Sequence, residues 1–292
     1  MDEHGIAEQR LLFAWLISDE AERQRLLEAH DYDADTAEHL LDLALCGPSY
    51  GPNKETEERF QRALLELCLA IARRTEADGT CARTARLLAA HCDDTADREA
   101  LLKEAAKAGT RMALWTEVYA AERDLALQHQ AHRRRRAAME AYQRALRACM
   151  HGSELNLEAI DALEALGRLA EANGDWATVQ QAHETWLAHV RASGDRVGLG
   201  EAHARLGTLK LDTGDKTGAI AELERAMVLL GEMGQDLPIA KLHAKLLLAY
   251  YGLGDSERAM HHLQTLLRLR ERHADEALDA ELDALLAGLE DL

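Results

Sequence analysis

A short phrase ending in Gly-Asp occurs three times in the sequence at a fixed interval. The three copies are Asn173-Gly174-Asp175, Thr213-Gly214-Asp215 and Leu253-Gly254-Asp255. Each copy lies between two segments whose apolar residues recur at helical spacing. A constant period of this size, about 40 residues, is typical of stacked helical arrays, in which a single repeat cannot bury its own apolar face. The period therefore predicts an all-α chain built of antiparallel helix pairs.

The composition supports this prediction and excludes several classes of function. Aromatic residues are only 4% of the 292 residues and prolines number three, whereas alanine, leucine, glutamate and arginine are abundant. The net charge is −18, from 34 basic and 52 acidic residues. Such a surface repels phosphate backbones and anionic lipids, so we expect neither nucleic acid nor membrane as a partner.

The cysteines and the N-terminal residues point to a cytoplasmic protein. Five cysteines are present, an odd number, and none forms a Cys-x-x-Cys pair, so we expect reduced and mostly buried thiols. The apolar run from Leu11 to Ile17 is too short to span a membrane. It also lacks the basic flank of a signal peptide.

The pattern of apolar residues and breaks predicts four parts. They are an N-terminal helical cap (1–46), degenerate helical repeats (54–118), regular repeats (119–271) and a C-terminal capping helix (275–292). The expected helix pairs are 82–91 with 95–108, 111–131 with 137–150, 155–172 with 176–192, 198–212 with 216–230, and 238–252 with 256–271. The capping helix would cover the open end of the stack with a leucine stripe and present acidic residues to water.

Aligning the three phrases shows a recurring frame. The first helix of each pair carries Leu163, His203 and His243 at one position, with Leu166, Leu206 and Leu246 at the next apolar position. Small residues, Gly167 and Gly207, follow in two of the three copies. The second helix has Val179, Ala219 and Ala259 near its start. This frame resembles the tetratricopeptide repeat (TPR), in which small residues let two helices approach closely. The resemblance implies a right-handed α-solenoid with helical caps.

The resemblance covers 119–271 clearly and 80–118 only faintly. The segment 138–146 is similar to the second helix of the family, although Arg133 and Arg134 replace Gly-Asp. The period of about 40 residues exceeds the usual length of the family's repeat, which is about 34 residues. Long repeats of this kind resemble those of bacterial regulators, including peptide-pheromone receptors and the sensor arms of some transcription activators.

In the TPR family the inner face of each first helix lines a concave groove that binds an extended or helical segment of another protein. Mapped onto this chain, the groove residues are Arg123, Gln130, Glu164, Arg168, Arg205, Thr208, Lys241, Lys245, Leu248 and Tyr251. The groove would change from mostly acidic to basic and apolar toward its C-terminal end. Charge complementarity of this kind selects and orients a partner.

One run of basic residues is a second candidate site. Arg133, Arg134, Arg135 and Arg136 follow one another where a tight turn between helices is expected. Guanidinium groups in such a turn could bind a phosphate or an acidic partner in bidentate fashion. The alternative is a solvated turn that balances a very acidic chain.

Two motifs with catalytic or metal-binding chemistry match only in their letters. Gly47-Pro48-Ser49-Tyr50-Gly51 has the form G-x-S-x-G, but the pattern before it is helical, whereas a nucleophile elbow follows a strand. The stretch 31–42 opens like a calcium loop, but Thr36 occupies the position that needs glycine. Capping of a helix by Asp35 explains that stretch better.

The remaining candidates also fail. Asp215 interrupts the glycine-lysine-threonine order that a phosphate-binding loop needs in Gly214-Asp215-Lys216-Thr217. The 14 histidines form neither a His-Glu-x-x-His motif nor a cluster with cysteine. We therefore expect no catalytic residue, no metal and no cofactor.

The leading hypothesis is a non-catalytic scaffold that binds a peptide or protein segment in the groove. The alternative is a peptide-sensing bacterial regulator whose superhelix changes shape on ligand binding and so controls an effector. A third hypothesis is an enzyme with a site in the segment 1–110, where the repeat pattern is weakest. The sequence leaves the oligomeric state open, a homo-oligomer included.

Overall fold

The computed structural model describes residues 14–15, 18–29, 32–46, 54–152, 155–232 and 236–272. Every regular element within these residues is an α-helix, which confirms the all-α prediction. The chain divides into two compact units, Met1–Ala162 (unit 1) and Leu163–Leu292 (unit 2).

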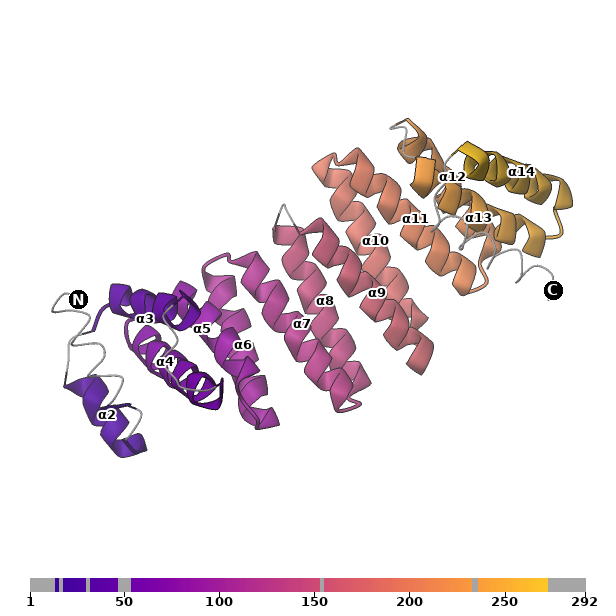
Figure 1. The fold of residues 1–292 in the computed structure, drawn as a ribbon. Coiled ribbons are helices and arrows are strands. Elements are labelled where there is room, and N and C mark those ends of the chain that lie inside the picture. Colours follow the sequence, from indigo (N-terminus) through magenta and orange to yellow (C-terminus); the bar gives the residue numbers. More distant parts are fainter. Residues whose placement is uncertain are drawn as a thin grey trace. The chain divides into compact units, whose positions relative to one another are not determined.

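Unit 1 contains seven complete helices among its described residues and the start of an eighth (Figure 1). They are α2 (Glu20–Glu28), α3 (Ala34–Cys46), α4 (Lys54–Arg74), α5 (Asp78–Ala90), α6 (Thr95–Arg111), α7 (Trp115–Ala131), α8 (Arg135–His151) and the first residues of α9 (Asn156–Asn173). Consecutive helices from α3 to α8 pack together, most extensively α5 with α6 and α7 with α8.

The core of unit 1 joins helices from both sides of the segment 47–53. Leu40 and Leu41 of α3 are buried in the same apolar cluster as Leu64, Leu67 and Ile71 of α4. The helices on the two sides of this proline-rich segment therefore stabilise each other. The four-part division expected from the sequence stays a prediction, and the division between units falls within its third part.

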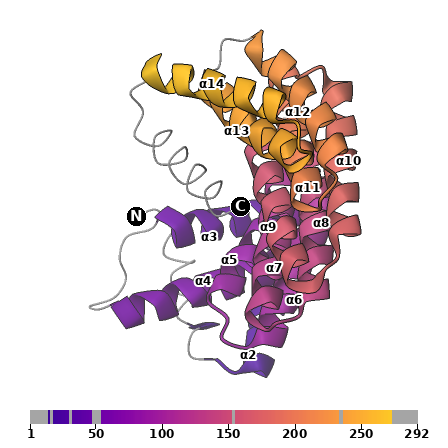
Figure 2. The same cartoon turned by 90° about the vertical axis from the view of Figure 1, so that its right-hand side faces the viewer.

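Unit 2 contains the rest of α9 and five further helices among the described residues. These are α10 (Trp176–Ser193), α11 (Arg196–Asp212), α12 (Lys216–Gly231), α13 (Asp236–Gly252) and α14 (Ser256–Arg272). Figure 2 shows α11, α12, α13 and α14 lying side by side, and each packs against the next. The strongest packing joins α11 to α12, as the repeat frame predicts.

The Gly-Asp phrase ends one helix and begins the next. Its three glycines have φ values of +75°, +88° and +79°, a left-handed conformation that residues with a Cβ rarely adopt. The aspartate that follows caps the next helix, because its carboxylate accepts a hydrogen bond from a backbone N–H in the first turn. In the second phrase, Asp215 Oδ1 accepts from the N–H of Gly218 at 2.9 Å.

The same turn occurs more often than the three predicted copies. Gly194-Asp195 is a fourth copy, with φ of +76° at the glycine and a bond of 3.0 Å from the N–H of Gly198 to the Asp195 carboxylate. Ala113 and Arg133 adopt the same left-handed conformation without glycine. From Thr95 onward, successive helices begin at a nearly constant interval of half the repeat period, so each period is two helices long.

Two local predictions are wrong. Asp33, rather than Asp35, accepts the capping bond at the start of α3, from the N–H of Thr36 at 2.8 Å. Arg111 ends α6 instead of beginning α7, because the left-handed turn at Ala113 follows it and α7 begins only at Trp115.

Some predictions concern residues outside those described. The expected capping helix 275–292 and the Gly47-Pro48-Ser49-Tyr50-Gly51 stretch both lie there. Among the helices that are described, none combines the length and the apolar character needed to cross a membrane.

Candidate functional site

The candidate site is a hollow of about 760 Å³ in unit 2. Six of the predicted groove residues line it: Glu164 and Arg168 from α9, Arg205 and Thr208 from α11, and Lys241 and Lys245 from α13. These three helices begin one repeat period apart along the chain, so equivalent positions present one face. The helical repeat thus brings together residues as far apart in sequence as 164 and 245.

Apolar side chains form the floor of this hollow. They are Leu163, Leu209, Leu230, Leu242, Trp176 and Pro238. The four leucines are buried, so the floor belongs to the core of the unit. Gly167 lies on the α9 side, where a Cβ added to it would meet nothing within 4 Å. The small residues Gly167 and Ala204 therefore help to keep the hollow open.

An ion pair joins α9 to α11 within the hollow. Arg205 Nη1 donates to Glu164 Oε1 at 2.7 Å, and Arg168 Nη1 lies 4.0 Å from the other carboxylate oxygen of Glu164. One carboxylate thus faces two guanidinium groups. Because Glu164 is half exposed, this arrangement orients the side chains more than it stabilises the fold.

The lysines of α13 add positive charge to the hollow. Lys241 and Lys245 are one helical turn apart and both line it. Lys245 is half-buried, and it forms no ion pair with an acid of the described residues. Counting the whole lining, four cations face three acids, Glu164, Glu201 and Asp212. The hollow is therefore locally positive on a chain whose net charge is −18.

One wall of the hollow carries a neutral histidine. Burial, together with the positive charge of Arg205, lowers the pKa of His183 to about 4. At neutral pH its imidazole is uncharged, so one ring nitrogen can donate a hydrogen bond while the other accepts one. His183 and Trp176 come from α10 and were not predicted as site residues, since the family's groove was expected from the first helix of each pair alone.

Four predicted groove residues do not line this hollow. Leu248 and Tyr251 lie further along α13, where Tyr251 is 44% exposed. Arg123 and Gln130 belong to α7 in unit 1. Gln130 Oε1 accepts a hydrogen bond from Tyr142 Oη at 3.1 Å, so this amide already has an internal partner. For these four residues, contact with a partner stays a prediction.

The basic run is partly neutralised by acids of the chain. Arg134 Nη1 lies 3.1 Å from Glu99 Oε2, and Arg136 Nε lies 3.2 Å from Glu140 Oε1. Arg133 occupies the left-handed turn position. Arg135 and Arg136 lie in the first turn of α8 rather than in the turn between the helices. Binding of an anion by Arg133 to Arg136 stays a prediction.

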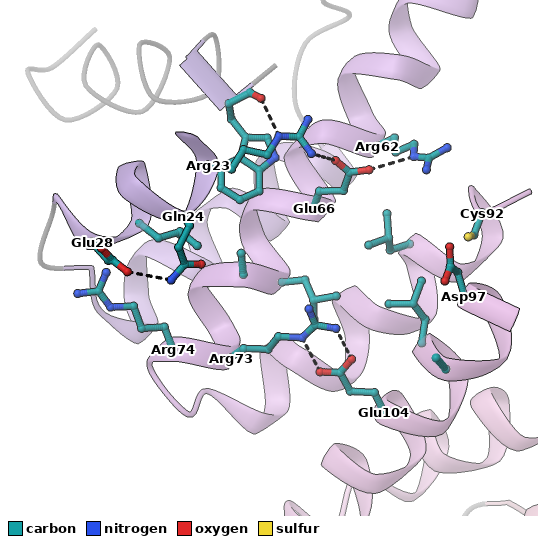
Figure 3. Close-up of a pocket in the computed structure, with 17 residues that line it drawn as sticks. Arg23, Gln24, Glu28, Arg62, Glu66, Arg73, Arg74, Cys92, Asp97 and Glu104 are labelled. Carbon is teal, nitrogen blue, oxygen red and sulfur yellow. Dashed lines mark hydrogen bonds and ion pairs between the residues drawn. The ribbon is translucent and has the colours of Figure 1, made fainter. Parts of the chain in front are cut away.

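A second hollow, of about 860 Å³, lies in unit 1 (Figure 3). Its lining comes from Trp15 and from α2, α4, α5 and α6, with part of the loop between α5 and α6. Figure 3 shows Arg73 facing Glu104, in a bidentate pair of 2.7 and 2.5 Å. Arg23 and Arg62 both pair with Glu66. Four arginines thus meet four acids in the lining, and this hollow lacks the positive excess of the unit 2 hollow.

Among the described residues one thiol lies beside a carboxylate: Cys81 Sγ donates to Glu104 Oε1 at 3.6 Å. Burial and the charge of Glu104 raise the pKa of the Cys81 thiol to about 12, so this neighbour does not activate it as a nucleophile. All five cysteines are free thiols, and only Cys46 is exposed. Burial raises the pKa of the Cys68 thiol to about 11 and that of Cys149 to about 12, which keeps these thiols protonated and unreactive. Within the part of the chain that the structure describes, no three His, Cys, Asp or Glu side chains are grouped to hold a metal ion.

No protein-family model and no curated protein matches the sequence. Among solved structures, BtubC (BKLC) from P. vanneervenii is 16% identical, with 74% of this chain and 91% of that chain covered and a TM-score of 0.48. Aspartyl phosphate phosphatase F from Bacillus subtilis is 13% identical, with 98% and 79% covered and a TM-score of 0.47. A putative kinesin light chain with nearly identical TPR-like repeats, from Podosopora anserina, is 14% identical, with 70% and 100% covered and a TM-score of 0.41. At TM-scores below 0.5 these likenesses decide nothing about the function of this chain.

Proposed function

We propose that the hollow of unit 2 binds a segment of another protein and that the chain acts as a non-catalytic interaction scaffold. The observation that carries this proposal is the convergence of three equivalent helix faces, from α9, α11 and α13, on one hollow. Its volume of about 760 Å³ is enough for a few side chains of a partner. Buried leucines offer apolar contact, while lysine and arginine side chains at the sides can orient acidic groups.

The test is a charge reversal in the hollow with a matched control elsewhere. We expect the double substitution Lys241→Glu and Lys245→Glu to weaken partner binding by tenfold or more, roughly the effect of placing like charges together at an interface. Lys107→Glu is the control, because Lys107 is an exposed lysine of α6 in unit 1. Proteins captured from the native host by wild-type and variant chains would be compared by quantitative mass spectrometry.

In this experiment the wild type and Lys107→Glu should retain the same partner, and the double variant should lose it. The melting temperatures of all three proteins should agree, since both lysines lie at the edge of the hollow and outside the apolar core. Equal capture by all three proteins would show that binding does not involve the hollow.

A second candidate function is a ligand-controlled regulator, and the Arg205–Glu164 pair favours it. This pair joins α9 to α11 inside the hollow, so an occupant that takes over Arg205 would release one contact between the two helices. A regulator should then change its radius of gyration in small-angle scattering when the captured partner binds, after subtraction of the partner's own contribution. A rigid scaffold should show no such change.

A further inference from the structure

The end of α14 brings the chain close to the hollow of unit 2. Ala240 and Ala244 of α13 share a buried apolar cluster with Leu266 and Leu269 of α14. The start of α13 therefore packs against the end of α14, and the two helices are antiparallel. Pro238, Lys241, Leu242 and Lys245, from the same half of α13, line the hollow. The chain thus leaves α14 at Arg272 beside the half of α13 that borders the hollow.

The residues after Arg272 have a sequence that complements this hollow. Residues 273–292 lie outside the part of the chain that the structure describes. Their sequence contains seven acids and neither lysine nor arginine: Asp275, Glu276, Asp279, Glu281, Asp283, Glu290 and Asp291. Leucines recur between these acids at helical spacing, at Leu278, Leu282, Leu285, Leu286 and Leu289. Acidic groups alternating with a leucine stripe match a positive hollow with a leucine floor.

We propose that residues 273–292 bind in the hollow of unit 2 as an internal ligand and compete there with the external partner. This proposal rests on the proposed function, because both require that the hollow of unit 2 is a binding site. A tethered segment reaches an effective concentration of the order of millimolar, so even weak complementarity suffices to fill the site. An external partner must then displace the segment, so the segment lowers the apparent affinity of the chain for that partner.

The hollow carries the features that this occupant needs. Lys245 is half-buried, and no acid of the described residues forms an ion pair with it. Arg168 is mostly exposed and meets Glu164 only at 4.0 Å. Buried Leu209, Leu230 and Leu242 line the same hollow. Carboxylates of the segment would pair with Lys245 and Arg168 while its leucines contact the floor.

Carbodiimide cross-linking of the full-length chain tests the proposal directly. The reagent joins a carboxylate to a lysine amine only when the two groups are in contact. We expect an isopeptide bond between Lys241 or Lys245 and one of Asp279, Glu281 or Asp283, identified by mass spectrometry. An equal mixture of ¹⁴N- and ¹⁵N-labelled chains separates links within one chain from links between copies.

Two variants serve as controls. Replacing both lysines by arginine keeps the charges and removes the reactive amines, so the cross-link should disappear. Leu282→Ser with Leu286→Ser should reduce the cross-link several-fold by weakening apolar contact. The same serine variant should bind an added synthetic peptide of residues 273–292, whereas the wild type should bind it at least tenfold more weakly.

Several outcomes would overturn the proposal. The segment could instead cover the end of the array, as the sequence predicts; it would then contact α14, which has no lysine, and no link to Lys241 or Lys245 would form. Links of mixed isotope would assign the hollow to a second copy of the chain. If the link is absent while Lys241→Glu with Lys245→Glu still abolishes partner capture, the proposed function stands and this inference fails. If the link forms while those substitutions leave partner capture unchanged, this inference stands and the proposed function fails.

Discussion

At two equivalent places in unit 2, one repeat period apart, a histidine of one helix meets a side chain of the next. His203 Nδ1 lies 2.7 Å from Glu222 Oε2 between α11 and α12, and His243 Nδ1 lies 2.8 Å from His262 Nδ1 between α13 and α14. A hydrogen bond between two imidazoles needs one donor and one acceptor, so it is lost when both rings are protonated. In the His203–Glu222 pair a protonated histidine can still donate to the carboxylate. In the His243–His262 pair two protonated rings would both be donors, so no hydrogen bond could form.

This difference predicts that acid weakens the packing of α13 on α14. Burial, together with the positive charges of His262 and His261, lowers the pKa of His243 to about 4. Burial and His261 also lower the pKa of His262, against the opposing effect of Glu224. The ring of Tyr250 stacks on the ring of His262.

The sign follows from proton binding in the two states. An unfolded histidine has a pKa of about 6.5, so between that pH and about 4 the unfolded chain binds more protons than the folded chain. The stability that depends on neutral His243 is therefore complete above about pH 6.5 and is lost as the pH falls. At pH 5.0 the loss is on the order of 2 kcal/mol, because each pH unit below about 6.5 costs about 1.4 kcal/mol. We expect His262→Glu, which recreates the His–Glu pair, to lose less. Urea unfolding at pH 7.5 and 5.0 measures this, and equal losses in both proteins would refute it.

Two glycines at one repeat position should respond oppositely to alanine. A Cβ at Gly207 would lie 2.8 Å from Leu223 Cγ and 3.2 Å from the backbone oxygen of Ala219, whereas a Cβ at Gly167 would meet nothing within 4 Å. Gly207→Ala should destabilise the protein by about 1–3 kcal/mol through overpacking of α11 on α12. Gly167→Ala should be neutral or stabilising by up to about 1 kcal/mol, because alanine favours the helix. Chemical denaturation of the two variants decides this, and similar effects at both positions would contradict the packing described.

At the scale of elements, the Gly-Asp turns hold the helix boundaries. The Asp215 carboxylate accepts the N–H of Gly218, which the helix itself leaves unpaired. Asp215→Ala should therefore cost about 1 kcal/mol, whereas Asp215→Asn, which keeps an acceptor oxygen, should cost a few tenths. Thermal unfolding of the two variants measures the difference. An alanine variant as stable as the wild type would show that this cap contributes nothing.

The helices could be predicted from sequence where the turn chemistry is explicit and less well where it is not. Glycine with aspartate marks four turns of unit 2, because one residue permits the left-handed conformation and the other caps a helix. Ala113 and Arg133 adopt that conformation with no such signal. Asp33 and Asp35 are equally good capping residues by type, and only the path of the backbone selects Asp33. Likewise, the left-handed turn at Ala113, which no glycine marks, places Arg111 at the end of α6.

At the scale of the whole molecule, the two hollows differ in how far the sequence could reveal them. Equivalent positions of the repeat fall on one face, so six lining residues of the unit 2 hollow were predictable. The unit 1 hollow depends on pairs such as Arg23 with Glu66 and Arg73 with Glu104, which are 43 and 31 residues apart. No repeat relates these residues, and arginines and acids are too numerous in the chain to be matched by inspection.

The uneven distribution of charge sets the unit 2 hollow apart. The chain carries a net charge of −18, yet the lining of this hollow has four cations against three acids. A partner is therefore attracted to the hollow and repelled by the remaining acidic surface, which favours a segment with a few acids over a highly charged one. Raising the ionic strength should weaken binding, since Lys241 is exposed and Lys245 is only half-buried, so salt screens both charges.

The central claim, that a partner binds in the hollow of unit 2, is tested most directly by lysine footprinting. The chain contains seven lysines: Lys54, Lys103, Lys107, Lys210, Lys216, Lys241 and Lys245. The captured complex and the free chain, both carrying Leu282→Ser and Leu286→Ser so that residues 273–292 do not compete for the hollow, would be acetylated under the same conditions and compared by mass spectrometry. We predict that Lys241 and Lys245 become protected in the complex while Lys54, Lys103 and Lys107 react as before. Protection confined to the lysines of unit 1, or none at Lys241 and Lys245, would contradict the account.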